Sequence, residues 1–258
     1  MSVYIEACES GSMFTNGKLK DNLNIYATTA ANPNESSWGT YCYPNDIVDG
    51  KHMNTCLGDL YSVNWMENSD AVSMSGETLA KQYAVVKQET TKSHVMQYGD
   101  MKFGSDPIGD FQSTLDTSMT EAMISGVAYT DEYAPNPERH TSVVDSRDIK
   151  LNHLYARVMT DGSHKAQLDL SSEINHRMRT DDVFRQVRST LNITDEDMAD
   201  VDVNNFDCYR QAISTYKHAC ADLDDYTLKH MRVLAVACEK TELHGDAVGH
   251  AITHACSH

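Results

Sequence analysis

Short apolar runs alternate with polar turns in the first half of the chain, a pattern typical of an α/β fold. Residues 3–5 and 23–30 are apolar or rich in β-prone side chains, and we expect both to form buried parallel strands. Apolar residues at helical spacing predict a helix over 77–89, and a strand is expected over 93–98. A further short strand is expected over 108–112. The front of the chain is therefore predicted to be part of a layered parallel sheet.

Helical periodicity replaces this pattern in the second half. Apolar spacing predicts one helix from Leu151 and another from Thr180, which we expect to be the N-cap of that helix. Three more helices are expected, over 206–220, 231–238 and 248–256. The expected apolar stripe of the helix from Thr180 consists of Val183, Phe184, Val187 and Leu191. This half of the chain is predicted to be all-α.

The change of pattern divides the chain into three segments. We expect an α/β segment over 1–141, a connecting segment over 142–170 and a helical segment over 171–258. The chain has 21 basic and 38 acidic residues, a net charge of −17, which argues against nucleic acid and anionic membranes as partners. We expect no membrane helix and no signal peptide, because no apolar run has the required length.

Seven cysteines suggest one free thiol and three disulfides. Cys8 stands alone, Cys42 and Cys56 share one loop, and four more lie near the end: Cys208, Cys220, Cys238 and Cys256. Three bridges would indicate an oxidising compartment such as the secretory route. The alternatives are a reduced cytosolic protein or zinc binding, which the absence of any Cys-x-x-Cys disfavours. Sequons at Asn34 and Asn192 are compatible with a secreted glycoprotein.

Cys8 directly follows the first apolar strand, within the sequence Glu6-Ala7-Cys8-Glu9-Ser10-Gly11-Ser12. A nucleophile at the carboxyl end of a buried parallel strand is held rigidly in a crevice. We expect Gly11 and its neighbouring serines to turn the chain so that backbone N–H groups face an oxyanion. The alternative is a buried structural cysteine.

Three blocks of sequence resemble the legumains, the asparaginyl endopeptidases of the caspase-like cysteine protease family. They are 4–41, then 57–67 with 93–99, and the C-terminal cysteine framework around 229–232. Leu60 and the loop between Cys42 and Cys56 resemble the plant members more than the animal ones. The resemblance implies that 1–141 is the back portion of a caspase-like parallel-sheet catalytic domain, 142–170 an activation peptide, and 171–258 a helical, disulfide-bonded prodomain.

The resemblance also implies roles for individual residues. Cys8 would be the nucleophile, Glu6 and Asp59 would line the pocket for the substrate asparagine, and the peptide-binding edge strand would contain Ser36, Ser37 and Trp38. Asp59 taken alone is more often a turn or cap residue. The implied disulfides are Cys42–Cys56, Cys208–Cys238 and Cys220–Cys256; spacing alone leaves their connectivity open.

The function implied is hydrolysis of proteins after Asn, and after Asp at acid pH, in a vacuole or lysosome. Protein and peptide substrates would be the partners, with the prodomain as an intramolecular inhibitor of the zymogen and no cofactor. Every histidine lies at His52 or later, so a general base upstream of Cys8 is absent and we expect this chain alone to be inactive. The alternative is a truncated, non-catalytic inhibitor or binding module that acts through its prodomain.

Two further sites stay open. Processing between enzyme and prodomain is expected after Asp145 or at a nearby asparagine, Asn136 or Asn152. His250, His254 and His258 share one face of the last helix, with His244 nearby, which could bind a metal. The preferred interpretation is a solvated helix face, so no metal site is predicted.

Overall fold

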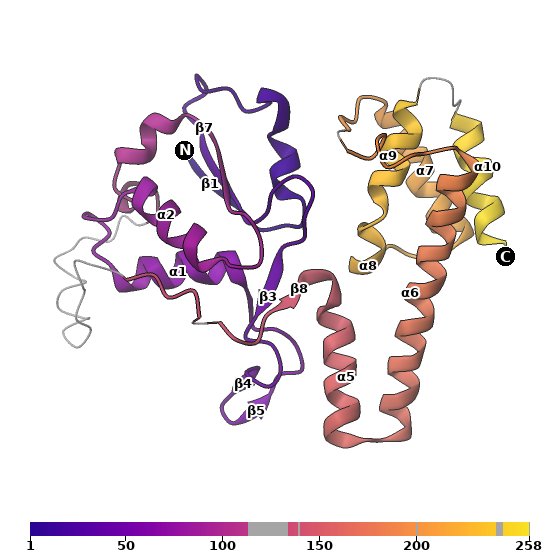
Figure 1. Ribbon diagram of the computed structural model, residues 1–258, viewed down its shortest axis with the longest axis horizontal. Helices are drawn as coiled ribbons and strands as arrows, with labels where there is room; N and C mark the ends of the chain where they lie inside the picture. Colours follow the sequence, from indigo (N-terminus) through magenta and orange to yellow (C-terminus); the bar gives the residue numbers. More distant parts are fainter. Residues whose placement is uncertain (113–133, 139, 200, 241–244, 258) are drawn as a thin grey trace. The chain divides into compact units, whose positions relative to one another are not determined.

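A computed structural model describes the chain except for residues 113–133, 139, 200, 241–244 and 258 (Figure 1). It contains two compact units, Met1–His153 and Leu154–His258. No helix among the described residues has the length and apolar character needed to cross a membrane.

The sheet of the first unit has the order β1-β2-β7, with bounds Ser2–Ile5, Tyr26–Thr29 and Met96–Gly99. β1 and β2 run parallel, as expected, whereas β7 is antiparallel to β2. β2 is buried along its whole length and β1 only in part. The expected start of the second strand at Leu23 is wrong, because Leu23 is 50% exposed and precedes the paired residues.

Helices α1 (Leu60–Ala71) and α2 (Leu79–Glu89) pack against each other and supply much of the core of this unit (Figure 1). α2 begins at Thr78, whose hydroxyl accepts the N–H of Lys81. Buried apolar side chains join these helices to the sheet: Tyr26, Ala30, Tyr61, Val72, Leu79, Val86, Val95 and Ile108. The α/β class predicted from the sequence is confirmed.

A second sheet has the order β6-β3-β8, with bounds Gly58–Asp59, Trp38–Thr40 and Val144–Asp145. Both neighbours of β3 are antiparallel to it. The hairpin of β4 (Ile47–Val48) and β5 (Lys51–His52) lies in the loop that the Cys42–Cys56 disulfide closes. The strand predicted over 108–112 is wrong. These residues instead form a short helix, α3 (Gly109–Gln112), which follows Pro107. Ile108 is buried, and its carbonyl accepts the N–H groups of Phe111 and Gln112, which holds the turn in helical form.

The second unit consists of helices, as the periodicity predicted. The first helix, α5 (Ile149–Asp161), begins within the first unit and continues into the second. The others are α6 His164–Thr190, α7 Phe206–Ala219, α8 Asp225–Leu228, α9 Met231–Glu239 and α10 Gly245–Cys256. The predicted helix start at Thr180 is wrong. α6 begins at His164, after the N-cap residue Ser163, whose hydroxyl accepts the N–H of Ala166. It continues through Thr180 because neither proline nor glycine interrupts it.

The core of this unit contains all four residues of the predicted stripe of α6, together with Tyr216, Leu234 and Ile252. Disulfides Cys208–Cys238 and Cys220–Cys256 bond the helices to one another, in the same pairs that the resemblance implied. Phe206, the first residue of the helix predicted over 206–220, is 55% exposed because it begins α7 at the end of the helical core.

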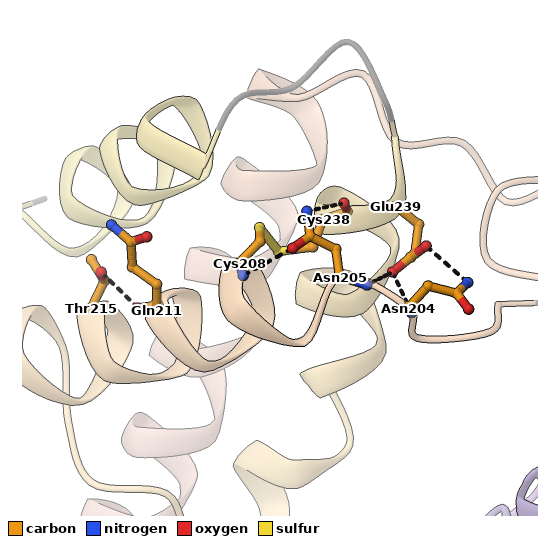
Figure 2. The surroundings of a disulfide bond; sticks show 7 residues. All are labelled: Asn204, Asn205, Cys208, Gln211, Thr215, Cys238 and Glu239. Carbon is orange, nitrogen blue, oxygen red and sulfur yellow. Dashed lines mark hydrogen bonds between the residues drawn. A yellow bond between two sulfur atoms is a disulfide. The ribbon is translucent and has the colours of Figure 1, made fainter.

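The first of these disulfides lies beside a capped helix start (Figure 2). The Asn205 side chain accepts the N–H of Cys208, so it caps α7. The Glu239 carboxylate accepts the main-chain N–H groups of Asn204 and Asn205. Cap, carboxylate and disulfide therefore all fix the start of α7 to the end of α9.

Candidate functional site

Cys8 lies just beyond the carboxyl end of β1, where the chain turns into the short 3-10 helix η1 (Ser10–Met13). It is a half-buried free thiol, and the other six cysteines are all in disulfides. Glu9, the next residue, adopts a left-handed conformation with φ 49°. The alternative of a buried structural cysteine does not describe this position, because Cys8 retains exposure at a strand end.

The backbone after Cys8 is more fully bonded than the sequence suggested. The N–H of Glu9 donates to the Glu35 carbonyl at 2.7 Å, and the N–H of Gly11 donates to the Ala31 carbonyl at 3.0 Å. Only the N–H of Cys8 itself has no acceptor among the described residues of this turn. Gly11 permits close packing, since a Cβ there would lie 2.7 Å from the Tyr98 hydroxyl oxygen. The expectation that this turn directs N–H groups at an oxyanion therefore stays a prediction, and it now rests on the N–H of Cys8.

Ser37 provides the polar contacts of the Cys8 sulfur. The main-chain N–H of Ser37 donates to Cys8 Sγ at 3.4 Å, and the Ser37 hydroxyl oxygen lies 3.7 Å from the same atom. An N–H donor stabilises a thiolate more than a neutral thiol. No histidine contacts the Cys8 sulfur in the part of the chain that the structure describes.

Glu6, at the end of β1, is a buried carboxylate that is only half satisfied. Its Oε2 accepts both the N–H and the hydroxyl of Ser62 at 2.9 Å each. Its Oε1 is buried and accepts no well-formed hydrogen bond from a described residue, although the Ser37 hydroxyl is near enough to act to lower the Glu6 pKa. Burial raises the pKa of Glu6 to about 7; the bonds from Ser62 oppose this shift, and the charge of Asp59 adds to it. Glu6 therefore carries a proton through much of the acidic range.

Asp59 ends β6 and precedes α1. It occupies the N-cap position, but its side chain makes no cap hydrogen bond. Burial raises its pKa as well. Asp59 thus holds the cap position without a capping hydrogen bond, and it is close enough to Glu6 for the two charges to repel. Its role in a substrate pocket stays a prediction.

Ser36, Ser37 and Trp38 lead into β3, the strand expected to bind substrate backbone. That strand is already paired with residues of the connecting segment. β8 lies antiparallel to it, with Trp38 opposite Asp145. The N–H of Ser146 donates to the Ser37 carbonyl, and the two serine hydroxyl oxygens are 3.1 Å apart. Residues 144–147, hereafter the occluding segment, thus pair with the strand edge at which the substrate backbone was expected to bind.

Arg147 anchors the occluding segment. Its guanidinium forms an ion pair with Glu9 and donates to the Ser36 hydroxyl at 3.2 Å. Burial acts to lower the pKa of Arg147, but Glu9, Cys8 and Asp145 outweigh it and raise that pKa. Sequence reasoning missed Arg147 and Ser146. Glu9 could have indicated such a residue, because a half-buried carboxylate beside the nucleophile is expected to pair with a cation.

The histidines of α10 do not form a metal site in the described residues. No group of three or more metal-binding side chains gathers there or elsewhere in the part of the chain with assigned positions. His244 and His258 lie outside the described residues. The solvated helix face stays the preferred interpretation.

Two family models match the chain. Residues 1–114 match the Peptidase C13 family, and residues 168–256 match the legumain prodomain. The chain is 35% identical to a vacuolar-processing enzyme of Citrus sinensis over 98% of its own length and 53% of the relative. It is 35% identical to the human legumain over 93% of its length and 54% of that relative. The chain thus spans about half the length of the curated relatives it matches.

Proposed function

Because the chain belongs to the legumain family of cysteine peptidases, we propose that Cys8 is the nucleophile of an endopeptidase that cleaves after asparagine. The Cys8 thiolate attacks the scissile carbonyl, the amine leaves, and water hydrolyses the thioester. The Cys8 N–H supports the developing oxyanion, because it is the donor of this turn that stays available. The structural support is the free thiol at the end of β1 with the Ser37 N–H directed at its sulfur.

The buried Oε1 of Glu6 is the observation that supports asparagine as the preferred substrate residue before the cleaved bond. A carboxamide presents two N–H donors, and an unsatisfied buried carboxylate oxygen needs a donor. Leucine would leave this oxygen unpaired. Glu6 and Asp59 together therefore favour a short amide side chain.

The same carboxylates explain why aspartate becomes a substrate in acid. Above the Glu6 pKa of about 7, an aspartate side chain meets like charge. Below it, Glu6 is neutral and can donate a hydrogen bond to the substrate carboxyl. Peptide chloromethyl ketones with Asn or Asp before the ketone test this in the Arg147→Ala variant, whose occluding segment has lost its anchor. The Asn peptide should alkylate Cys8, with loss of chloride, at pH 5 and 7.5, and the Asp peptide at pH 5 only. Equal labelling by Asp at both values would contradict the specificity proposed.

The occluding segment makes the connecting region an intramolecular inhibitor. It occupies β3 in the antiparallel manner of a substrate, with Ser146 opposite Ser37. Ser146 has no carboxamide to offer the pocket, so the segment binds without presenting the preferred residue. Protein and peptide substrates would bind after it leaves. Asp145, one of the expected processing positions, is paired within β8, which favours cleavage elsewhere while this strand stays in place.

The compartment proposed is a vacuole or lysosome reached by the secretory route. Three disulfides favour an oxidising site of folding. Both sequon asparagines, Asn34 and Asn192, are exposed and could carry glycans.

Hydrolysis also needs a base to move protons, and no histidine contacts Cys8 among the described residues. We therefore expect no turnover of a fluorogenic Asn peptide by the 258-residue chain at pH 5. Turnover that Cys8→Ala abolishes would show that the chain supplies its own base. Absence of labelling by an Asn ketone would instead favour the non-catalytic binding module.

A further inference from the structure

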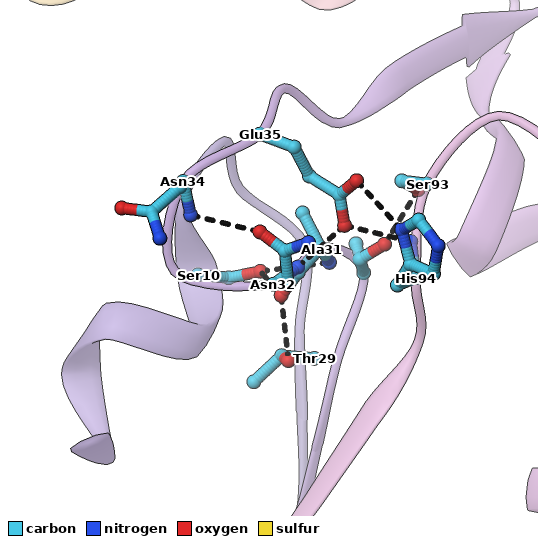
Figure 3. A network of polar contacts seen from close by, with 9 residues as sticks. Ser10, Thr29, Ala31, Asn32, Asn34, Glu35, Ser93 and His94 are labelled. Atoms are coloured by element: carbon cyan, nitrogen blue, oxygen red, sulfur yellow. Dashed lines mark hydrogen bonds and ion pairs between the residues drawn. The ribbon is translucent and has the colours of Figure 1, made fainter. Parts of the chain in front are cut away.

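Glu35 bridges two segments of the first unit that are distant in sequence (Figure 3). Its Oε1 accepts the main-chain N–H groups of Asn32 and His94, both at 2.7 Å, and its Oε2 lies 2.9 Å from His94 Nδ1. Burial acts to raise the pKa of Glu35, but these hydrogen bonds outweigh it and hold that pKa below its ordinary value. The side chain is therefore an ionised clasp between the loop after β2 and the segment before β7.

Serine hydroxyls secure the same loop from both sides. Ser93 Oγ donates to the Ala30 carbonyl at 2.6 Å. From the opposite side, Ser10 Oγ accepts the Ala31 N–H at 3.1 Å (Figure 3). The loop is consequently held between the turn that contains Cys8 and the segment that enters β7.

Two short connections run from Glu35 to Cys8. The Glu35 carbonyl accepts the N–H of Glu9, which holds a left-handed conformation that residues other than glycine rarely adopt. Farther along the same loop, the N–H of Ser37 donates to Cys8 Sγ. A shift of Glu35 would therefore disturb both the turn after the nucleophile and the donor to its sulfur.

We infer that Glu35 is a positioning residue for the nucleophile: its carboxylate clasps His94 and thereby holds the Ser37 N–H against the Cys8 sulfur. This inference rests on the proposed role of Cys8. Because a thiolate gains more from that N–H than a thiol does, loss of the clasp should slow the reaction of Cys8 with an alkylating agent. Reactivity would thus depend on a side chain that touches neither substrate nor sulfur.

The inference predicts an effect opposite in sign to simple electrostatics. Removing a nearby negative charge should by itself make a thiolate easier to form. Loss of the clasp should instead make it harder, because the Ser37 N–H is no longer held in place. The direction of the change therefore separates positioning from charge.

The experiment measures the rate of iodoacetamide alkylation of Cys8 from pH 4 to 10, which requires neither substrate nor a general base. Cys8 is the one free thiol of the chain. For Glu35→Ala, the pH of half-maximal rate should rise by about one unit, equivalent to losing one hydrogen bond to a charged group. For Glu35→Gln it should stay near wild type, because the amide oxygen can accept both main-chain N–H groups while the NH₂ donates to neutral His94.

Asp46→Asn is the matched control. Asp46 also accepts from a histidine ring, His52 Nδ1 at 2.7 Å, and from a main-chain N–H, that of Asn54 at 2.8 Å. Its hydrogen bonds stay within the loop closed by Cys42–Cys56, so its removal should not move the alkylation profile.

Two outcomes decide the matter. A raised midpoint in Glu35→Ala with a wild-type midpoint in Glu35→Gln supports the inference. An unchanged or lowered midpoint in Glu35→Ala overturns it, and Asn-selective labelling of Cys8 would still stand. Should Glu35→Ala lose the fluorescence of the folded unit, His94→Ala keeps the main-chain donor and should raise the midpoint by a smaller amount; no rise in that variant overturns the inference as well.

Discussion

Replacing Glu6 with glutamine should remove much of the pH dependence of stability of the first unit. In the folded unit the pKa of Glu6 is about 7, against an ordinary value of 4.5. Between these values the folded unit binds more protons than the unfolded chain, so stability falls as pH rises. The ionised Glu6 therefore costs the folded unit about 3 kcal/mol of stability above pH 7, and this cost is absent below pH 4.5.

Glu6→Gln keeps the acceptor for Ser62, since the amide oxygen can take the place of Oε2. At pH 8 the variant should be about 3 kcal/mol more stable than wild type, and at pH 4.5 the two should be nearly equal. Both tryptophans, Trp38 and Trp65, lie in the first unit, so denaturant unfolding followed by tryptophan emission reports that unit.

A control with the opposite sign is Asp46→Asn. Burial acts to raise the pKa of Asp46, but its bonds to His52 and Asn54 outweigh it and lower that pKa. This substitution should destabilise the unit at neutral pH, and the loss should shrink in acid as the wild-type carboxyl protonates. Parallel stability curves for wild type and Glu6→Gln across pH 4.5–8 would refute the reasoning for Glu6.

Three further predictions concern the occluding segment and the helical unit. Arg147→Ala should speed iodoacetamide alkylation of Cys8 because the anchor of the occluding segment to Glu9 is gone. The rate is compared at pH 9.5, above the ordinary cysteine pKa of about 8.5; an unchanged rate would show that the segment does not limit access. Replacing Cys208 and Cys238 together with serine should lower the stability of the helical unit by about 2–4 kcal/mol, measured by far-ultraviolet circular dichroism; no loss would mean that the bond adds nothing. The hydrogen bond from Lys240, with those from Thr194, lowers the pKa of Asp197 to about 2. Asp197→Asn should therefore destabilise the helical unit at pH 5, where the carboxylate is ionised, and leave its stability unaffected near pH 2. Equal destabilisation at both pH values would exclude an ionic role.

Local patterns predicted most of what positions the nucleophile. An apolar run that ends at Cys8 predicted a strand followed by a turn, because strand burial and chain reversal depend on adjacent residues. The stripe of Val183, Phe184, Val187 and Leu191 was found for the same reason. Thr180 was misjudged because a local cap signal does not end a helix whose flanking residues also favour helix.

Pairings between distant residues could not be predicted. The pairing of Trp38 with Asp145 joins two short strands, each too brief to show periodicity. The ion pair of Arg147 with Glu9 depends on that pairing, so it was missed as well. The helix α3 depends on the burial of Ile108, which the sequence around it does not reveal.

Labelling of Cys8 by peptide ketones tests the central claim most directly. Two peptide chloromethyl ketones that differ only in Asn or Leu, and from which the Cys8 sulfur displaces chloride, are incubated at pH 5.5 with the Arg147→Ala variant, whose occluding segment has lost its anchor to Glu9. The modified residue is identified by peptide mass spectrometry. The account predicts that the Asn ketone modifies Cys8 at least about tenfold faster than the Leu ketone, the effect of one hydrogen bond to the buried Glu6 oxygen. It also predicts no adduct in Cys8→Ala. Equal rates for the two ketones, or an adduct on another residue, would contradict it.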